Sequence, residues 1–396
     1  IKPILLNTST PWSAFLCGSQ GSGKSHALSC MLENCLLDDE KVGRNPNPLA
    51  GIVFHYDSSQ TSGVCEAAYL CSDIKTRVLV SKSNYGNLKK QYDQVVMDHK
   101  GDMSVEKLEI HPSHLNTERV KTLMAVGNDG EMPLYMHVII KILREMAEKS
   151  GGVDVFDYRL FKKRLAEEGF MDRQAPALKM RLDLLESFVD TPKSQSWAKN
   201  KATTRNLLQG QPGVLTIIDL TDPVIDAETA CVLFDICLSI FLSQTQEEIG
   251  RIVGLDEAHN YMSETSTAAT QFTTRLLKSV REQRHQGTRV VIATQEPTIN
   301  TALLDLCSIT MVHRCTSPAW VAVLKQHIAG LHLSGRPNED VFRRVVRLGL
   351  GESLLFCPMA AVGIDERGAL QRMDDGFLKV RTRKRVTADG GLSRLA

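Results

Sequence analysis

The residues best suited to chemistry lie near the start of the chain, between Gly18 and Ser25. They read Gly-Ser-Gln-Gly-Ser-Gly-Lys-Ser, which fits the pattern G-x-x-x-x-G-K-[ST]. An apolar run at Trp12–Cys17 precedes them, and a helical pattern at His26–Leu37 follows. Glycines let successive N–H groups turn toward phosphate oxygens, and a helix N-terminus adds the positive end of its dipole. This segment therefore predicts a phosphate-binding loop.

Two side chains of the loop have separate roles in such a site. Lys24 is placed to reach the β- and γ-phosphates of a nucleotide, and the Ser25 hydroxyl can serve as a ligand of Mg²⁺. The alternative is a glycine-rich helix cap with no ligand, but the strand–loop–helix context favours nucleotide binding. We expect ATP and Mg²⁺ as cofactors. The residues expected to surround the phosphates are Gly18, Ser19, Gln20, Gly21, Ser22, Gly23, Lys24 and Ser25.

A second candidate is an apolar strand that ends in two acidic residues. Arg251–Leu255 is followed directly by Asp256 and Glu257. Asp256 would hold Mg²⁺ through water, and Glu257 would orient or deprotonate an attacking water molecule. Asp256 as a simple helix cap is the alternative. His259 has no metal-binding partner nearby in the sequence, and we interpret it as a helix surface or core residue.

A third strand, Arg289–Thr294, ends in a polar pair. Thr294 or Gln295 could sense the γ-phosphate or position water, because the C-terminal ends of parallel strands face a bound nucleotide. An ordinary strand-to-loop transition is the alternative. Asp219, at the end of another apolar strand, is either a site residue or a structural cap.

Cationic side chains suggest two further roles. Arg275, Arg281 and Arg284 lie on the helix expected at Thr267–His285, and each is a candidate for a finger that acts across a subunit interface. Solvated surface arginines are the more common case. The run from Lys379 to Arg385 holds five cations, and it either binds nucleic acid or a neighbouring subunit or is a solvated charged segment.

The elements that must position these residues alternate between strand and helix. Short, almost wholly apolar strands between helices indicate a mostly parallel sheet covered on both faces, an α/β fold. The middle of the chain shows helical periodicity instead, followed by a polar linker at Thr191–Thr204. Besides those named above, the expected strands are Gly51–Tyr56, Val214–Leu220, Ile309–Val312 and Ser353–Phe356, and the expected helices are Pro133–Lys149, Asp157–Glu168, Ala175–Val189, Ala227–Leu242 and Asn338–Leu348.

The domain organisation we predict is one α/β core interrupted by an all-helical insertion. Residues 1–87 would form the first part of the core, 88–204 the insertion, 205–385 the second part of the core, and 386–396 a C-terminal tail.

Composition excludes some classes of protein. Of the 396 residues, 42 % are hydrophobic and 23 % charged, which excludes global disorder. The net charge of +1 gives no bulk case for nucleic-acid binding, although a local basic patch would suffice. Ten scattered cysteines without a CxxC pair argue against structural zinc and indicate reduced thiols, hence an intracellular location, cytoplasmic or nuclear. We expect no membrane span in this chain. Because it begins at Ile1, we expect a part of a longer protein.

Together these segments resemble the HerA/FtsK superfamily of P-loop ATPases, which includes HerA-like proteins and the conjugation and type IV secretion ATPases. The resemblance implies a RecA-like P-loop NTPase core and a hexameric ring that moves DNA or another substrate through its channel. It implies catalytic roles for Lys24, Glu257 and Gln295 and metal binding by Ser25 and Asp256. Arg281, which opens an Arg-Glu-x-x-Arg segment, is the first choice for the finger, and Arg284 the second. The segments that carry the resemblance are 18–25, 255–260, 281–287, 293–297, 304–314 and 351–355.

Three functions remain open at this point. The first is a ring-type DNA translocase that hydrolyses Mg-ATP. The second is an ATP-dependent switch or scaffold whose helical insertion recruits a protein partner, and the third is a protein-transport ATPase. The tetrad Asp256–His259 also suggests a DEAH-box helicase, but we find neither a second lobe nor a Ser-Ala-Thr motif. The Asn-Lys-x-Asp motif of GTPases is absent too.

Overall fold

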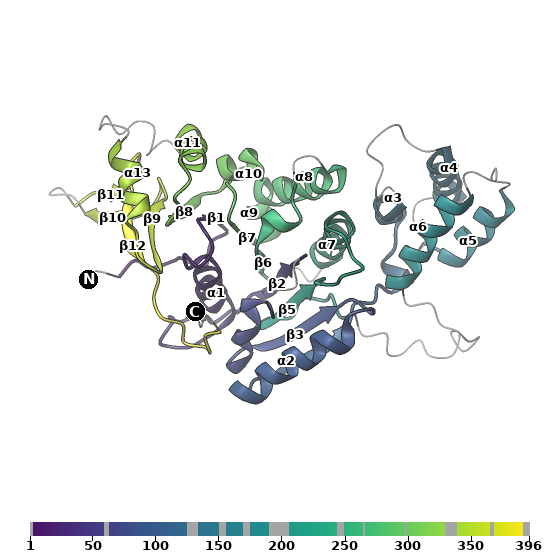
Figure 1. Cartoon of the computed structure of the whole chain (residues 1–396), viewed down its shortest axis with the longest axis horizontal. Helices are drawn as coiled ribbons and strands as arrows, with labels where there is room; N and C mark the ends of the chain where they lie inside the picture. The colour runs from purple at the N-terminus through teal and green to yellow at the C-terminus, as the bar shows by residue number, and fades with distance from the viewer. Residues whose placement is uncertain are drawn as a thin grey trace.

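The computed structural model describes residues 3–58, 63–124, 134–149, 156–168, 175–189, 206–243, 249–263, 266–297, 299–328, 339–364 and 368–390. These residues form a ten-stranded sheet in the order β12-β9-β8-β1-β7-β6-β2-β5-β3-β4 (Figure 1). The strands are β1 (Ser13–Cys17), β2 (Ala50–His55), β3 (Lys75–Val80), β4 (Met103–Lys107), β5 (Val214–Asp219), β6 (Arg251–Leu255), β7 (Thr288–Thr294), β8 (Ile309–His313), β9 (Glu352–Phe356) and β12 (Leu378–Arg381).

Neighbouring strands from β8 to β4 are parallel, whereas β9 pairs antiparallel with both β8 and β12. Every residue of β1, β6 and β7 is buried, as expected for parallel strands covered on both faces. The predicted mostly parallel α/β fold is therefore confirmed. A separate hairpin pairs β10 (Ala361–Ile364) with β11 (Leu370–Arg372).

Two hydrophobic cores lie on opposite faces of the sheet. One joins the sheet to α1 (Lys24–Leu36), to α2 (Tyr85–His99) and to the 3-10 helix η1 (Glu66–Ser72). The other joins it to α7 (Ala227–Leu242), α8 (Thr267–Arg281) and α10 (Thr301–Leu306). Other helices in the described part of the chain are α9 (Gln283–Gln286), α11 (Pro318–His327), α13 (Glu339–Val346) and the 3-10 helices η2 (Pro112–His114) and η4 (Ala258–Asn260).

The expected helices of the middle segment are present and lie together at one end of the molecule (Figure 1). They are α4 (Leu134–Lys149), α5 (Tyr158–Glu167) and α6 (Ala175–Phe188), and a further helix that we did not predict, α3 (Thr117–Met124), lies with them. Helix α3 contacts both α6 of this group and α7 of the core. The polar linker expected at Thr191–Thr204 lies outside the described residues.

The structure corrects the start of the insertion, which we expected at residue 88. Helix α2 packs on the central sheet, and β4 pairs with β3, so the core extends at least to Lys107. Strand β4 was missed because it is an edge strand in which only Val105 is buried. A short strand of this kind has neither an apolar run nor a full hydrophobic face to reveal it. Among the described helices, none combines the length and the apolar character that crossing a bilayer requires.

Candidate active site

Three adjacent strands bring the predicted site residues together. Strand β7 lies between β1 and β6, and all three are parallel. Their C-terminal ends therefore share one edge of the sheet. The loop 18–25 follows β1, Asp256 follows β6, and Gln295 follows β7. Residues far apart in the sequence thus meet at this edge, where ligands of open α/β sheets bind.

The candidate metal site consists of Ser25 and Asp256. The Ser25 hydroxyl donates a hydrogen bond of 3.0 Å to Oδ1 of Asp256. Asp256 is buried, and Ser25 lies in the first turn of α1. A hydroxyl and a carboxylate are oxygen ligands of the kind that Mg²⁺ prefers. These residues therefore fit Mg²⁺ beside the phosphate-binding loop.

Lys24 crosses the inside of the loop. Its ammonium donates to the carbonyl oxygen of Ser19 at 3.2 Å, and its side chain is buried. Burial lowers the pKa of Lys24, and the carboxylates of Glu257 and Asp256 oppose this effect. An anionic phosphate in the loop would further favour the charged ammonium, because an opposite charge nearby stabilises the charged form.

The loop backbone needs glycine at two positions. Gly23 has a φ of 102°, and a Cβ atom there would lie 3.1 Å from Cα of Gly351. A Cβ atom at Gly18 would lie 2.7 Å from Cβ of His313. The last residue of β8 and the residue directly before β9 therefore pack behind the loop. The first N–H groups of α1 have no carbonyl partner within the helix, so they are available to phosphate oxygens.

Glu257 has an unusual backbone conformation. Its φ of 47° places a non-glycine residue in the left-handed region, which is typical of functional sites. The Gln295 amide donates to Oε2 of Glu257 at 3.3 Å, and Nδ1 of His259 lies 3.4 Å from the same oxygen. Burial lowers the pKa of His259, while Glu257 opposes the shift. The predicted base and the predicted sensor are therefore in contact. His259, which we interpreted as a helix surface or core residue, lies beside the same carboxylate.

Two other polar strand ends have structural partners. The Thr294 hydroxyl bonds to the backbone of Glu296, as donor to its carbonyl and acceptor from its N–H. Asp219 is buried and accepts hydrogen bonds from the Tyr92 hydroxyl and the Thr221 N–H. Of the two sensor candidates, the geometry favours Gln295, and Asp219 is a structural cap.

The candidate finger arginines lie at the opposite edge of the sheet. Arg281 and Arg284 are exposed on α8 and α9, in the segment that leads into the start of β7 at Thr288. The length of β7, about 20 Å at 3.3 Å per residue, separates them from the nucleotide edge of the same chain. Arg275 is not a free finger, because it forms ion pairs with Asp235 and with Glu118.

The basic run 379–385 is corrected in part. Lys379 and Arg381 are exposed and pair with Glu352. Arg383 and Arg385 instead turn inward and pair with Glu33 of α1. The five cations therefore do not form one exposed patch.

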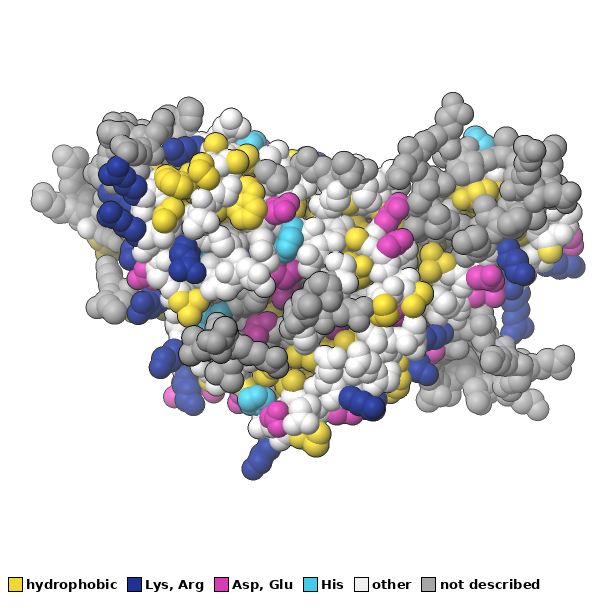
Figure 2. All heavy atoms as spheres, viewed as in Figure 1, with side chains coloured by type: hydrophobic (Ala, Val, Ile, Leu, Met, Phe, Trp, Pro, Cys, Tyr) yellow, Lys and Arg dark blue, Asp and Glu magenta, His cyan; other side chains and the backbone are white. Residues whose placement is uncertain are grey.

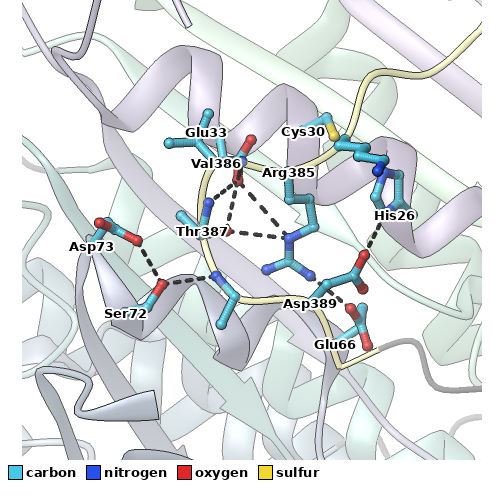
Figure 3. A network of polar contacts seen from close by, with 12 residues as sticks. His26, Cys30, Glu33, Glu66, Ser72, Asp73, Arg385, Val386, Thr387 and Asp389 are labelled. Atoms are coloured by element: carbon cyan, nitrogen blue, oxygen red, sulfur yellow. Dashed lines mark hydrogen bonds and ion pairs between the residues drawn. The ribbon is translucent and has the colours of Figure 1, made fainter. Parts of the chain in front are cut away.

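The segment 382–390, which we call the C-terminal strap, holds the phosphate-loop helix in place (Figure 3). Glu33 is fully buried and accepts hydrogen bonds from the N–H of Val386 at 3.0 Å and from the N–H and hydroxyl of Thr387 at 2.9 and 2.6 Å. Arg385 also pairs with Glu66 of η1 at 2.6 Å. Residues 386–390, expected as part of a tail, thus link α1 to η1. A buried glutamate within an apolar helix is the one sequence signal that could have indicated this contact.

All ten cysteines are unpaired thiols, and all but Cys307 and Cys357 are buried. Burial raises the pKa of Cys17, Cys30 and Cys35 to about 12, so these thiols are inert toward neutral solution.

No protein-family model matches the chain, and no curated protein matches it in sequence. Solved structures do resemble it. The structure of VirB4 of Thermoanaerobacter pseudethanolicus aligns with a TM-score of 0.54 at 14 % identity, covering 96 % of this chain and 91 % of that one. The plasmid coupling protein TrwB in complex with ADP and Mg²⁺ aligns with a TM-score of 0.53 at 12 % identity, covering 98 % and 91 %. These solved structures therefore share the predicted fold of this chain, an α/β core of the RecA-like P-loop type.

Proposed function

We propose that the chain is an ATPase that binds Mg-ATP in the loop 18–25 and hydrolyses it with Glu257. The observation that carries this proposal is the hydrogen bond between Ser25 and Asp256. It joins a phosphate-binding loop to an acidic strand end, the two parts that hold Mg²⁺ in P-loop NTPases. The plasmid coupling protein TrwB, which has the same fold, was solved with ADP and Mg²⁺, and this supports the assignment.

Each residue at the sheet edge has a defined role in this reaction. The Lys24 ammonium would bind the β- and γ-phosphates, and the N–H groups of the loop would hold their oxygens. Glu257 would orient the attacking water and accept its proton, while Gln295 keeps the Glu257 carboxylate in position. Mg²⁺, held by Ser25 and Asp256, would neutralise the charge that develops on the phosphate oxygens.

A second copy of the chain would complete the site. Arg281 and Arg284 are exposed at the sheet edge remote from the loop of their own chain. A neighbouring copy in a ring can bring such an arginine to the γ-phosphate, where it would stabilise the transferring group. We therefore propose a homo-oligomeric ring, a hexamer, in which Arg281 is the first candidate for the finger and Arg284 the second.

DNA is the substrate we propose for this motor. Lys and Arg side chains gather at the end of the molecule that contains α13 and the C-terminal strands (Figure 2). Exposed members of this group are Arg343, Arg344, Arg347, Arg372, Lys379 and Arg381. A concentration of positive charge attracts the phosphate backbone despite a net charge of only +1.

ATP turnover with and without double-stranded DNA tests this assignment. A DNA translocase should be stimulated by DNA, and the stimulation should weaken steeply with salt as counterions compete for the phosphates. If DNA leaves the ATP turnover rate unchanged, the alternatives are favoured: a protein-transport ATPase, or an ATP-dependent scaffold that recruits a partner through α3–α6.

The Lys24→Ala variant tests the nucleotide site itself. It should lose both ATP binding and turnover, because loop residues 18–25, all of which the structure describes, hold no second cationic side chain. Lys41→Ala is the matched control, since Lys41 is exposed in the loop after α1. Undiminished turnover in Lys24→Ala would reject the site.

A further inference from the structure

We propose that His55, Cys65 and Asp256 form a second metal site, which takes a borderline-soft divalent cation such as Zn²⁺. One ligand atom from each of the three residues lies within 4.8 Å of the others, and all three residues are buried. His55 ends β2, Asp256 follows the neighbouring strand β6, and Cys65 immediately precedes η1. The fold therefore assembles the cluster from three separate segments.

The imidazole of His55 is buried without a hydrogen-bond partner among the described residues. Its side chain is 3 % exposed, and neither ring nitrogen has a hydrogen bond within the described part of the chain. The nearest carboxylate oxygen, Oδ2 of Asp256, lies 3.8 Å from Nδ1, which is too far for a hydrogen bond. A buried polar group without a partner is destabilising, and it calls for a water molecule or an ion in contact with it.

The ligand set favours zinc over magnesium. Imidazole nitrogen, thiolate sulfur and carboxylate oxygen are the three side-chain donors that bind Zn²⁺, whereas Mg²⁺ takes oxygen. Zinc–ligand distances of about 2.0–2.3 Å in a tetrahedron place the ligand atoms about 3.6 Å apart. The ligand atoms, which lie within 4.8 Å of one another, would therefore move closer together by up to about an ångström when zinc binds. On binding, the Cys65 thiol gives its proton to solvent and forms the metal–sulfur bond.

The two metal sites share Asp256 through different oxygens. Oδ1 accepts the hydrogen bond of Ser25, and Oδ2 faces His55. A zinc ion on Oδ2 would draw the carboxylate away from Ser25 and weaken the Mg-nucleotide site. The cluster would therefore act as an inhibitory metal site, a consequence that rests on the function proposed above. The sequence did not indicate this cluster, because its three ligands do not form a local metal-binding motif such as CxxC.

Cobalt titration of the nucleotide-free full chain tests the site directly. Co²⁺ replaces Zn²⁺ in such sites and gives a thiolate-to-metal absorption band in the near ultraviolet. We expect one Co²⁺ per chain, with a band that one equivalent of Zn²⁺ removes. Cys65→Ser should abolish the band, and His55→Gln should weaken Co²⁺ binding by at least about tenfold. Cys71→Ser is the matched control and should retain the wild-type band, because Cys71 is a buried thiol on η1 outside the cluster.

Two outcomes would overturn the proposal. If the wild-type chain gives no thiolate band, the space beside His55 holds water. If the band persists in Cys65→Ser, another thiol binds the metal. The inhibitory effect of zinc is tested in a separate experiment, which measures the affinity for Mg-ADP with and without Zn²⁺. Zinc should weaken it at least threefold in the wild type and not in Cys65→Ser. Failure of all ADP binding would reject the proposed nucleotide site, whereas the cobalt result would still stand.

Discussion

The Ser25 hydroxyl donates to Oδ1 of Asp256 at 3.0 Å, although 231 positions separate the two residues in the chain. The contact ties the first turn of α1 to the end of β6. It fixes the carboxylate beside the phosphate-binding loop before any ligand enters. Preorganised groups of this kind need no rearrangement when charge develops on the substrate.

Replacing Ser25 should therefore weaken the binding of Mg²⁺ more than the binding of the nucleotide. Ser25→Ala removes a ligand and the partner of Asp256, and we expect the apparent affinity for Mg²⁺ in ATP turnover to fall about 10- to 100-fold. A magnesium titration of turnover measures this. Ser29→Ala is the control, because Ser29 lies one turn along α1 and its buried hydroxyl makes no hydrogen bond among the described residues. Equal magnesium curves for Ser25→Ala and the wild type would contradict the metal assignment.

The C-terminal strap should contribute strongly to stability. Arg385 and Arg381 belong to the same basic run and both pair with glutamates, but their side chains are 1 % and 71 % exposed. Arg385→Ala leaves part of the charge of Glu33 and Glu66 without its buried partner. We expect the free energy of unfolding in urea to fall by about 3–5 kcal/mol. Arg381→Ala should change it by less than about 1 kcal/mol. Equal decreases in the free energy of unfolding for the two variants would contradict a special role for the buried ion pairs of Arg385.

His313 should make stability depend on pH. Burial behind the loop lowers the pKa of His313 from 6.5 to about 4, and the nearby Lys24 and His26 act in the same direction. The unfolded chain thus binds more protons between these values, so stability falls as the pH falls from 6.5 toward 4. The pKa difference corresponds to about 3 kcal/mol at the lower limit.

Urea unfolding at several pH values checks this. His313→Gln should reduce the acid slope by that amount, whatever its stability at neutral pH. His137→Gln, at an exposed position on α4, should retain the wild-type slope. A slope unchanged by His313→Gln would contradict the prediction.

Mixing two inactive variants tests the finger across subunits. Lys24→Ala should not bind ATP, and Arg281→Ala should bind but not hydrolyse it. In a mixed ring, an intact loop of the Arg281→Ala chain meets an intact arginine of the Lys24→Ala chain, so turnover should partly return. Loss of the finger usually lowers turnover about 10³- to 10⁵-fold, so the recovery is easily measured. If mixtures stay inactive, the same test with Arg284→Ala examines the second candidate, and failure of both excludes a finger on this helix.

The sequence predicted the site residues that belong to local patterns. The loop 18–25 has its own signature. Asp256, Glu257 and Gln295 follow largely apolar strands, and the alternation of such strands with helices implies a parallel sheet with a shared edge. Hydrophobic periodicity could not reveal β4, because only one of its five residues, Val105, is buried.

Other features depend on contacts between distant segments. Glu33 and Thr387 meet across 354 positions, and nothing near either residue in the sequence indicates the other. The same holds for His55 and Cys65, which approach Asp256 only because β2 lies beside β6. The sequence alone made Arg275 a candidate finger, but in the fold it forms an ion pair with Asp235 of α7. Local sequence patterns thus predict the proposed nucleotide site, whereas the contacts that support it become visible only in the fold.

The central claim is that Glu257 activates water for ATP hydrolysis, and a single measurement tests it. Steady-state ATP turnover by Glu257→Gln should fall about 10²- to 10⁴-fold, the usual contribution of a general base, while ATP binding stays within about threefold of the wild type. The amide keeps the shape of the side chain but cannot accept the proton. Turnover by Glu257→Gln at the wild-type rate would contradict the account.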